Sequence, residues 1–287
     1  SIINFIVVLA LVSIPEGLPL AIGVSLAFSV MKMHSDNLLV RKLDAPEKMG
    51  GVEEICCGKS GTITTGNMQV LQYYCEGREI KNTRKNTLFH CELQTETLEL
   101  IKESIMYNCD ARVEMDATTY VPVGNSTEVA LLKFLQDAEV PVHLLIQKKL
   151  DKIRAVIPFS SEKKRSAVAM VHPERPGEVV VYVKGAPEVI LAHCDRQLDR
   201  QQQFAHLDQK TANDQVNEMA SQALRVLGFA YTQMSLDQWT QLEQNDVSPE
   251  QQLDEYLMGG QLKLCFIGAF GLRDPLRPRV KSCVNYA

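Results

Sequence analysis

The stretch ICCGKSGTITTG, residues 55–66, is the most informative part of this sequence, because an apolar run leads into a loop of glycines, small hydroxyls and one lysine. Backbone amides, hydroxyls and a lysine ammonium are the groups that hold a phosphoryl group. We therefore expect Ile55–Cys57 to form a strand that ends in a phosphate-binding loop. A reactive nucleophile would stand at the end of that strand, but the residue there is Gly58.

The bulk composition limits the classes of function. With 287 residues, the chain is long enough for about two domains of roughly 150 residues each. Its net charge of -5 argues against a general surface for nucleic acid or anionic lipid. The 8 cysteines include no C-x-x-C pair, so a reducing environment is favoured over a disulfide framework or a zinc site.

Residues 2–30 form an apolar run in which Glu16 is the only ionisable residue. Such a run can cross a hydrocarbon layer of about 30 Å as a helix. Two prolines and a glycine in IPEGLP, residues 14–19, predict a break in this helix. Unwound carbonyls beside a carboxylate would make an ion site, and the alternative is a kinked helix with a neutral glutamate. The coincidence of the break with the charge favours the ion site.

The segments after residue 66 alternate between β-rich and helical patterns. Helices are expected at residues 95–109 and again after an N-cap at Ser126 or Thr127. The β-rich runs are separated by polar turns, which predicts an antiparallel sheet. The segment GLRDPLRP, residues 271–278, follows the last predicted strand. If it shares one site with the loop near residue 60, the residues between them form an inserted domain.

The order of the motifs resembles one family, the type II P-type cation-pumping ATPases, and within it most closely the plasma-membrane-type calcium pumps. The resemblance extends over essentially the whole chain. Any one motif is weak, whereas their shared order is specific. The motifs that carry the resemblance are IPEGLP (14–19), LVRKL (39–43), GKSGT (58–62), GNSTEVALL (124–132), FSSEKKRS (159–166), KGAPE (184–188), LRVLGFAY (224–231) and DPLRP (274–278).

The resemblance implies a fold class. It implies an α+β nucleotide-binding domain, an antiparallel sheet with helices, inserted in a partial haloacid-dehalogenase-like (HAD-like) α/β phosphorylation domain and preceded by one broken transmembrane helix. It also implies an internal fragment of a longer pump, which could not transport ions in isolation. The expected boundaries are 1–33 for the transmembrane helix, 34–66 for the first part of the phosphorylation domain, 67–276 for the nucleotide-binding domain and 277–287 for the start of the second part of the phosphorylation domain.

The resemblance also assigns roles at the nucleotide site. Phe159 would stack on adenine, because a flat apolar ring suits a base. Most of these assignments have a structural alternative. Phe159 could be a core ring and Glu128 a partner of a helix N-terminus. Lys184 could be a solvated lysine and Asp274 part of an Asp-Pro turn. For the remaining residues, Glu128 would accept from the adenine amino group, Lys184 would border the pocket, Arg225 and Arg277 would reach the phosphates, and Asp274 would orient the nucleotide and the loop.

In the loop, the resemblance implies that Lys59 neutralises charge on the transferred phosphoryl group, while Ser60, Gly61 and Thr62 cradle it. The Ser60 carbonyl would help to bind Mg²⁺. The family motif is DKTGT, so Gly58 stands where the family has its phosphate-accepting aspartate. Glycine offers no carboxylate oxygen, and formation of the phosphoenzyme is not expected. An altered codon, a natural non-phosphorylating relative and an unidentified acceptor are the three explanations.

The function implied is that of a fragment of an ATP-driven calcium pump, with ATP and Mg²⁺ as cofactors and Ca²⁺ as the transported ion. Ile14 and Glu16 would form part of the calcium site. The protein would be an integral membrane protein, of the plasma membrane, with a cytoplasmic nucleotide domain. Its partners would be membrane lipid and the remaining transmembrane helices; nucleic acid is not expected, and a calmodulin-type regulator of this family leaves no signal here.

An ATP-binding regulatory or scaffold protein that does not turn over is the alternative from another class. It would share the nucleotide motifs and differ from a pump at Gly58. A HAD-like phosphatase is disfavoured, because it needs the same aspartate and leaves IPEGLP unexplained.

Overall fold

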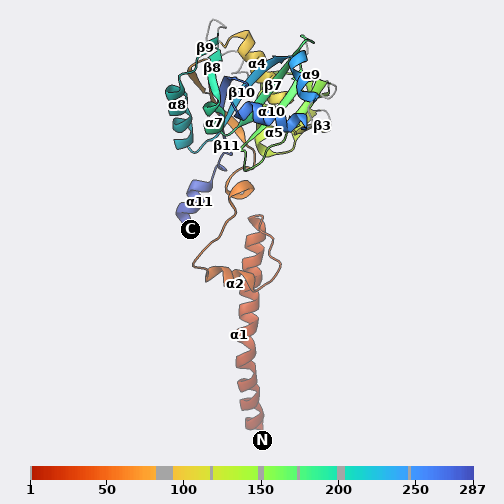
Figure 1. Ribbon diagram of the computed structural model, residues 1–287. Helices are drawn as coiled ribbons and strands as arrows, with labels where there is room; N and C mark the ends of the chain where they lie inside the picture. Colours follow the sequence, from red (N-terminus) through yellow and green to blue (C-terminus); the bar gives the residue numbers. More distant parts are fainter. Residues whose placement is uncertain are drawn as a thin grey trace. The chain divides into compact units, whose positions relative to one another are not determined.

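The structure is a computed structural model that describes residues 2–81, 93–116, 119–147, 152–172, 175–198, 204–244 and 247–287, without the side chains of residues 10–16 and 147. The chain divides into two units, residues 1–57 and residues 58–287 (Figure 1).

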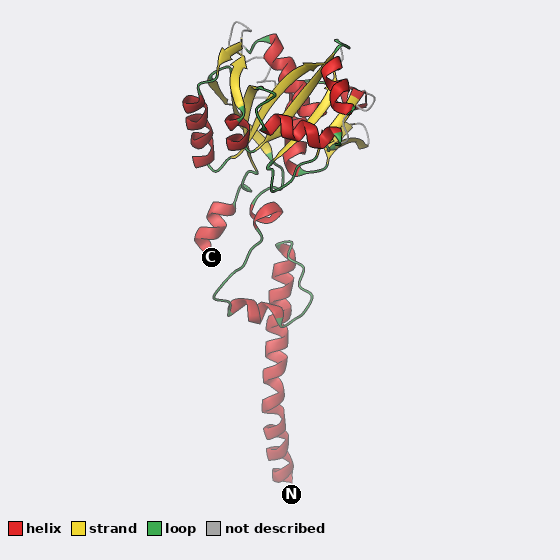
Figure 2. Ribbon diagram, viewed as in Figure 1, coloured by secondary structure: helices red, strands yellow, loops and turns green. Residues whose placement is uncertain are grey.

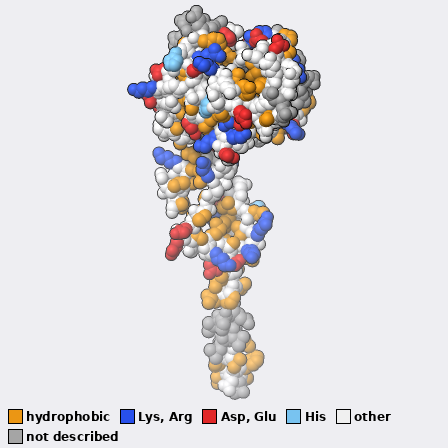
Figure 3. All heavy atoms as spheres, in the orientation of Figure 1, with side chains coloured by type: hydrophobic (Ala, Val, Ile, Leu, Met, Phe, Trp, Pro, Cys, Tyr) orange, Lys and Arg blue, Asp and Glu red, His pale blue; other side chains and the backbone are white. Residues whose placement is uncertain are grey.

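The described residues of the unit 1–57 form two helices, α1 (Ile2–Ser35) and α2 (Ala45–Gly50). At about 1.5 Å per residue, α1 is about 50 Å long. Apolar side chains along α1 are exposed, as Figure 3 shows, and Ile2 is 80% exposed. By length and composition, one helix among the described residues could cross a membrane, through its segment Gly17–Ser35.

Helix α1 runs through IPEGLP without interruption, so the predicted break is wrong. A proline removes one backbone donor, but its fixed φ near −65° suits a helix, and the apolar neighbours continue the helix on both sides. The helix also extends to Ser35, beyond the expected boundary at residue 33. Because the side chains of residues 10–16 lie outside the description, the roles of Ile14 and Glu16 stay predictions.

The apolar run Ile55–Cys57 does not form the predicted strand. Ile55 is 67% exposed, and among the residues that the structure describes no strand pairs with this segment. An isolated extended segment gains no ladder hydrogen bonds, so composition alone does not make it a strand. The prediction of a strand before the loop is therefore wrong for this structure.

Among its described residues, the unit of residues 58–287 is built around a sheet of 9 strands in the order β2-β1-β11-β10-β7-β6-β5, with β8 added beside β11 and β9 beside β8 (Figures 1 and 2). The pair β8–β11 is parallel, and the other pairs are antiparallel. A separate antiparallel hairpin is formed by β3 and β4. The strands are β1 (Gln69–Cys75), β2 (Arg78–Lys81), β3 (Arg112–Asp116), β4 (Thr119–Val123), β5 (Ile153–Ile157), β6 (Arg165–Val171), β7 (Glu178–Gly185), β8 (Cys194–Leu198), β9 (Phe204–His206), β10 (Arg225–Ser235) and β11 (Leu264–Arg273).

Helices cover both faces of this sheet (Figure 2). One core forms under α4, α5 and α6, and the other under α7, α8, α9 and α10. Helix α11 follows β11. The helices are α4 (Thr95–Tyr107), α5 (Ser126–Asp137), α6 (Val142–Gln147), α7 (Pro187–Ala192), α8 (Gln209–Ser221), α9 (Leu236–Glu243), α10 (Pro249–Met258) and α11 (Val280–Tyr286).

The two cores follow from alternation along the strands, since successive side chains point to opposite faces. Tyr73, Phe229 and Phe270 pack in the core under α4 and α5, whereas Val181 and Val183 pack in the other core. The Tyr73 and Phe270 rings stack with centroids 5.4 Å apart, and Phe229 meets Phe270 edge-on at 5.2 Å. This packing fixes the strands whose ends carry the sequence motifs.

The predicted antiparallel sheet with flanking helices is confirmed, and α4 and α5 occupy the two segments predicted to be helical. The predicted N-cap of α5, at Ser126 or Thr127, is wrong by one or two residues. Asn125 is the cap, and its side-chain oxygen accepts from the Thr127 amide at 3.0 Å. Asparagine is at least as good an N-cap as serine or threonine, so it takes the position.

Candidate functional site

Four sequence motifs meet on one side of the sheet, where β6 and β10 begin and β7 and β11 end, because neighbouring strands are antiparallel. This side is called the sheet edge. Arg165, the first residue of β6, pairs with Gly185 at the end of β7, and Gly185 also pairs with Gly228 of β10. Arg225, the first residue of β10, lies opposite Leu272 near the end of β11. FSSEKKRS, KGAPE, LRVLGFAY and DPLRP therefore reach the same edge.

The GKSGT loop is fastened to this edge through Asp274, which follows β11. The Thr64 hydroxyl donates to Asp274 Oδ2 at 2.5 Å, and the Thr65 hydroxyl donates to Asp274 Oδ1 at 3.1 Å. The Thr64 hydrogen bond lowers the pKa of the Asp274 carboxyl from its ordinary value of 3.8. A carboxyl with a lowered pKa stabilises the folded chain above its ordinary pKa and loses that effect as the pH falls, so the contact holds at neutral pH.

Arg277 makes a second set of contacts with the loop. Its Nε donates to the Thr62 carbonyl at 3.1 Å, and a terminal guanidinium nitrogen donates to the Gly61 carbonyl at 2.7 Å. Its amide donates to the Ile63 carbonyl at 3.0 Å. Segments more than 200 residues apart in the sequence therefore form one structure, with separations of 209 to 216 residues. Arg277 positions the loop here, and its contact with phosphate stays a prediction.

Two glycines give the loop its shape. Gly61 and Gly66 have φ angles of 78° and 75°, in the left-handed region that favours glycine. Gly58 is different, because its φ of -64° and ψ of 141° suit any residue. A Cβ atom at Gly58 would have Thr62 Oγ1 as its nearest neighbour, at 3.8 Å. The backbone at Gly58 therefore leaves room for a side chain.

A pocket of about 440 Å³ opens between the loop and the sheet edge. Its charged lining residues are the cations Lys59, Arg225 and Arg273 and the carboxylate Asp274. Because cations outnumber carboxylates, the pocket favours a ligand with several negative charges. Its volume lies in the range of small-molecule sites. The other lining residues are Ser60, Gly66, Met68, Ser126, Ala223 and Leu272.

Glu128, in the first turn of α5, and Lys184, near the end of β7, form a buried ion pair. Lys184 Nζ lies 2.5 Å from Glu128 Oε1, and the two side chains are 10% and 14% exposed. Glu128 Oε2 accepts from the amides of Asp110 and Ala111, both at 3.0 Å. The Lys184 ammonium also donates to the Asn108 carbonyl. The structure therefore gives both residues protein partners, and their predicted contacts with adenine and the pocket stay predictions.

Phe159 lies in the loop between β5 and β6, and its side chain is 56% exposed. An exposed ring at the edge that carries the other motifs is free to stack on a flat ligand. The alternative of a core ring does not hold for this structure, because a core phenylalanine would be buried.

The structure brings some predicted site residues together and leaves others apart. Lys59, Ser60, Arg225 and Asp274 line one pocket. Phe159 follows the end of β5 at the same sheet edge and does not line that pocket. Sequence reasoning missed Arg273, although its place directly before DPLRP is a signal that could have been used. It also selected Ser126 only as a cap. Those residues line the pocket because the strand end and the helix start face the loop.

No cluster of three or more His, Cys, Asp or Glu side chains that could hold a metal ion occurs among the residues that the structure describes. Asp274 is the carboxylate of the pocket, and both of its oxygens accept from threonine hydroxyls. Mg²⁺ prefers several oxygen ligands in octahedral geometry. The residues present do not fit a resident magnesium site.

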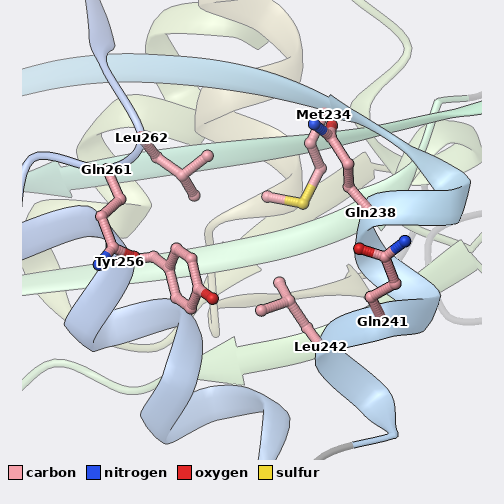
Figure 4. Close-up of a pocket in the computed structure, with 7 residues that line it drawn as sticks. All are labelled: Met234, Gln238, Gln241, Leu242, Tyr256, Gln261 and Leu262. Atoms are coloured by element: carbon pink, nitrogen blue, oxygen red, sulfur yellow. The ribbon is translucent and has the colours of Figure 1, made fainter.

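A second pocket, of about 450 Å³, lies near the opposite end of β10 (Figure 4). Met234 lines it, about 30 Å along the strand from Arg225 at roughly 3.3 Å per residue. None of its lining residues is charged, which makes it unsuited to a phosphate ligand. They are Met234, Gln238, Gln241, Leu242, Tyr256, Gln261 and Leu262.

Comparison with known proteins agrees with this arrangement. Residues 96–279 match the family model of the P-type ATPase cytoplasmic domain N. The chain is 34% identical over 284 residues to calcium-transporting ATPase 10, plasma membrane-type, of Oryza sativa subsp. japonica, which covers 97% of this chain and 26% of that protein. It is 33% identical over 289 residues to plasma membrane calcium-transporting ATPase 4 of Bos taurus, covering 97% of this chain and 22% of that protein.

The chain thus spans about a quarter of the length of the curated relatives it matches. The family model matches more than half of the chain, and it covers the sheet edge where the predicted motifs meet. This chain belongs to the P-type ATPases, and its residues 96–279 are the cytoplasmic domain N of that family.

Proposed function

We propose that this chain is the ATP-binding part of a calcium-transporting P-type ATPase whose phosphate-accepting position is occupied by glycine. The observation that carries the proposal is the cationic pocket lined by Lys59, Arg225 and Arg273. The resemblance puts Lys59 in the loop that meets the γ-phosphate and Arg225 on the phosphates. A charged pocket bounded by both motifs is what a bound triphosphate requires.

In this proposal, residues 67–276 hold the nucleotide and deliver it to the loop. Phe159 stacks on adenine, because its ring is exposed at the same sheet edge. Glu128 and Lys184 support the floor of the nucleotide site through their buried pair, and Lys184 borders it. Residues 34–66 and 277–287 belong to the phosphorylation domain, in which residues 67–276 are the inserted domain. The contacts of Asp274 and Arg277 with the loop support this division.

Mg²⁺ enters with the phosphates of ATP rather than as a resident ion. The pocket has one carboxylate, Asp274, and the Thr64 and Thr65 hydroxyls occupy its oxygens. The Ser60 carbonyl would be one ligand of the Mg²⁺ that the nucleotide brings. Such a Mg²⁺ would supply neutralisation of phosphate charge, while this chain's residues would orient the phosphates.

The unit of residues 1–57 is proposed to lie in the plasma membrane through α1. The unit of residues 58–287, the nucleotide unit, would lie in the cytoplasm. Membrane lipid and further helices of the longer protein would cover its exposed apolar side chains. Glu16 and the backbone near Ile14 would form part of a Ca²⁺ site. Pro15 and Pro19 have no amide hydrogen, so the carbonyls four residues before them lack intrahelical donors, and oxygen ligands suit Ca²⁺.

A second function, an ATP-binding regulatory or scaffold subunit without turnover, is favoured by Gly58 itself. Glycine cannot accept a phosphoryl group, and at this position it is not required by the backbone conformation. Both functions share the bound nucleotide and differ in what the longer protein does with it.

Equilibrium dialysis of the 287-residue chain in detergent against labelled ATP tests the shared claim. We expect saturable binding of one ATP per chain. The absence of saturable binding would overturn both functions.

Arg225→Gln is expected to weaken ATP binding about 10- to 100-fold, because one charged hydrogen bond to phosphate is lost. Binding of adenosine should be unchanged, since adenosine has no phosphate. Calorimetry with the two ligands measures the difference. Arg154→Gln is the matched control, because Arg154 is exposed on β5 and does not line the pocket. Equal losses in the two variants would contradict the phosphate assignment.

A further inference from the structure

A shielded carboxylate outside the pocket binds the loop that carries Phe159. Asp254 lies on α10, and its side chain is 16% exposed. Its Oδ1 accepts from a terminal nitrogen of Arg165 at 2.5 Å, and its Oδ2 lies 2.9 Å from Lys163 Nζ. Two cations of the FSSEKKRS motif therefore converge on one carboxylate that lies 89 residues further along the chain.

Arg165 links this carboxylate to the loop backbone. Its side chain is 9% exposed, and its other terminal nitrogen donates to the Lys163 carbonyl at 3.2 Å. Within the loop, the Lys164 amide donates to the Ser160 carbonyl at 2.8 Å, and the Lys163 amide donates to the Ser160 hydroxyl at 3.1 Å. The loop directly after Phe159 is thus a closed turn whose last residues are held by Asp254.

The same loop contacts β7 by a separate route. The Ala186 amide donates to the Lys164 carbonyl at 2.9 Å. A Cβ atom on Gly185 would lie 2.4 Å from that carbonyl oxygen, so the close approach requires glycine. These contacts hold one backbone atom of the loop, whereas Asp254 holds two of its side chains.

We propose that Asp254 is a positioning residue of the ATP site, which sets the conformation of residues 159–165 and thereby the place of the Phe159 ring. The inference rests on the proposed role of Phe159 in binding adenine. Asp254 itself touches no nucleotide, because both of its oxygens are engaged by Lys163 and Arg165.

The charge of Asp254 agrees with a stable contact between this carboxylate and the loop. Burial raises the pKa of the Asp254 carboxyl, but hydrogen bonds from Lys163 and Arg165 outweigh this effect and lower the pKa overall. The carboxylate is therefore charged at neutral pH. No metal or ligand is needed to explain its partners.

Asp254→Asn is expected to weaken binding of ATP and of adenosine by the same factor, about tenfold, because a displaced ring loses its stacking geometry. Binding is measured by calorimetry on the 287-residue chain in detergent, at a temperature where circular dichroism shows both proteins folded. Glu255→Gln, an exposed carboxylate on the same helix, is the matched control and should bind as the unaltered chain does.

A thermodynamic cycle with Phe159→Ala separates positioning from general stability. If Asp254 acts through the ring, Asp254→Asn should cause no further loss of affinity in the Phe159→Ala chain. A full tenfold loss in that background would overturn the inference. So would wild-type affinity in a folded Asp254→Asn chain.

Should Asp254→Asn fail to fold, Lys163→Gln provides the same test, because Lys163 is 45% exposed and its loss is mild. We expect about a two- to threefold loss of affinity that vanishes in the Phe159→Ala background. A loss that persists there overturns the inference. If the unaltered chain binds no ATP, the proposed function itself fails, and that result is distinct from binding that ignores Asp254.

Discussion

In the longer calcium pump of which we propose this chain is a part, Gly58→Asp is expected to produce a phosphoenzyme and calcium-dependent ATP hydrolysis that the Gly58 protein lacks. The gain is on the order of 10⁶-fold, the size of effect seen when a catalytic nucleophile is removed. The structure allows the substitution, since the backbone at Gly58 suits any residue and a Cβ atom would meet Thr62 Oγ1 at 3.8 Å. Labelling with γ-phosphate-labelled ATP, followed by acid quenching, measures the intermediate.

Gly58→Asn is the matched control for this experiment, because it has nearly the same shape as aspartate without a carboxylate. We expect it to bind ATP and to form no acid-stable, hydroxylamine-sensitive intermediate. The aspartate variant should also bind ATP less tightly than the glycine chain, since its charge repels the phosphates. If Gly58→Asp binds ATP and still gives no intermediate, the scaffold function is favoured over the pump.

Lys184→Met is expected to lower the free energy of unfolding of the nucleotide unit by about 3 kcal/mol. Removing one partner of a buried ion pair leaves the other charge uncompensated, which typically costs 3–5 kcal/mol. The lower end applies because the Asp110 and Ala111 amides still donate to Glu128. Urea unfolding followed by the fluorescence of Trp239, the only tryptophan in the sequence and fully buried, measures the change.

Two further variants identify the cause of that loss. Lys210→Met removes an exposed lysine and should change the free energy of unfolding by less than about 0.5 kcal/mol. Glu128→Gln combined with Lys184→Met should recover part of the stability, because the glutamine carries no charge. A double variant as unstable as the sum of the two single variants would contradict an uncompensated charge.

The fold of the nucleotide unit could be predicted from its sequence where the signal is local. The β-rich runs around β6 and β7 and the helical periodicity of α4 depend on residue type and spacing, and the structure confirms them. The expected break in α1 was wrong because prolines fit a helix that apolar neighbours support. The strand at Ile55–Cys57 was wrong because a strand depends on partners that its own sequence does not specify.

The candidate site likewise combines residues with a local sequence signal and residues whose partners lie far away in the sequence. The local composition of the loop indicated Lys59, and the family resemblance indicated Arg225 and Asp274; all three line one pocket. The partner of Lys184 could not be predicted, since Glu128 lies 56 residues away in the sequence and the fold alone brings the two side chains together. Asp254 could not be predicted for a similar reason. It lies in an acidic segment with a polar composition, and that segment gives no sign that Lys163 and Arg165 contact it.

A single label, measured twice on the 287-residue chain, tests whether the chain binds ATP without accepting its γ-phosphate. The chain is equilibrated with ATP labelled at the γ-phosphate, and the retained label is counted first under native conditions and again after acid denaturation. We predict about one label per chain before acid and none after it, because the proposed ATP site retains the nucleotide and Gly58 accepts no phosphoryl group. Label that survives acid and is released by hydroxylamine, or no label under native conditions, would contradict it.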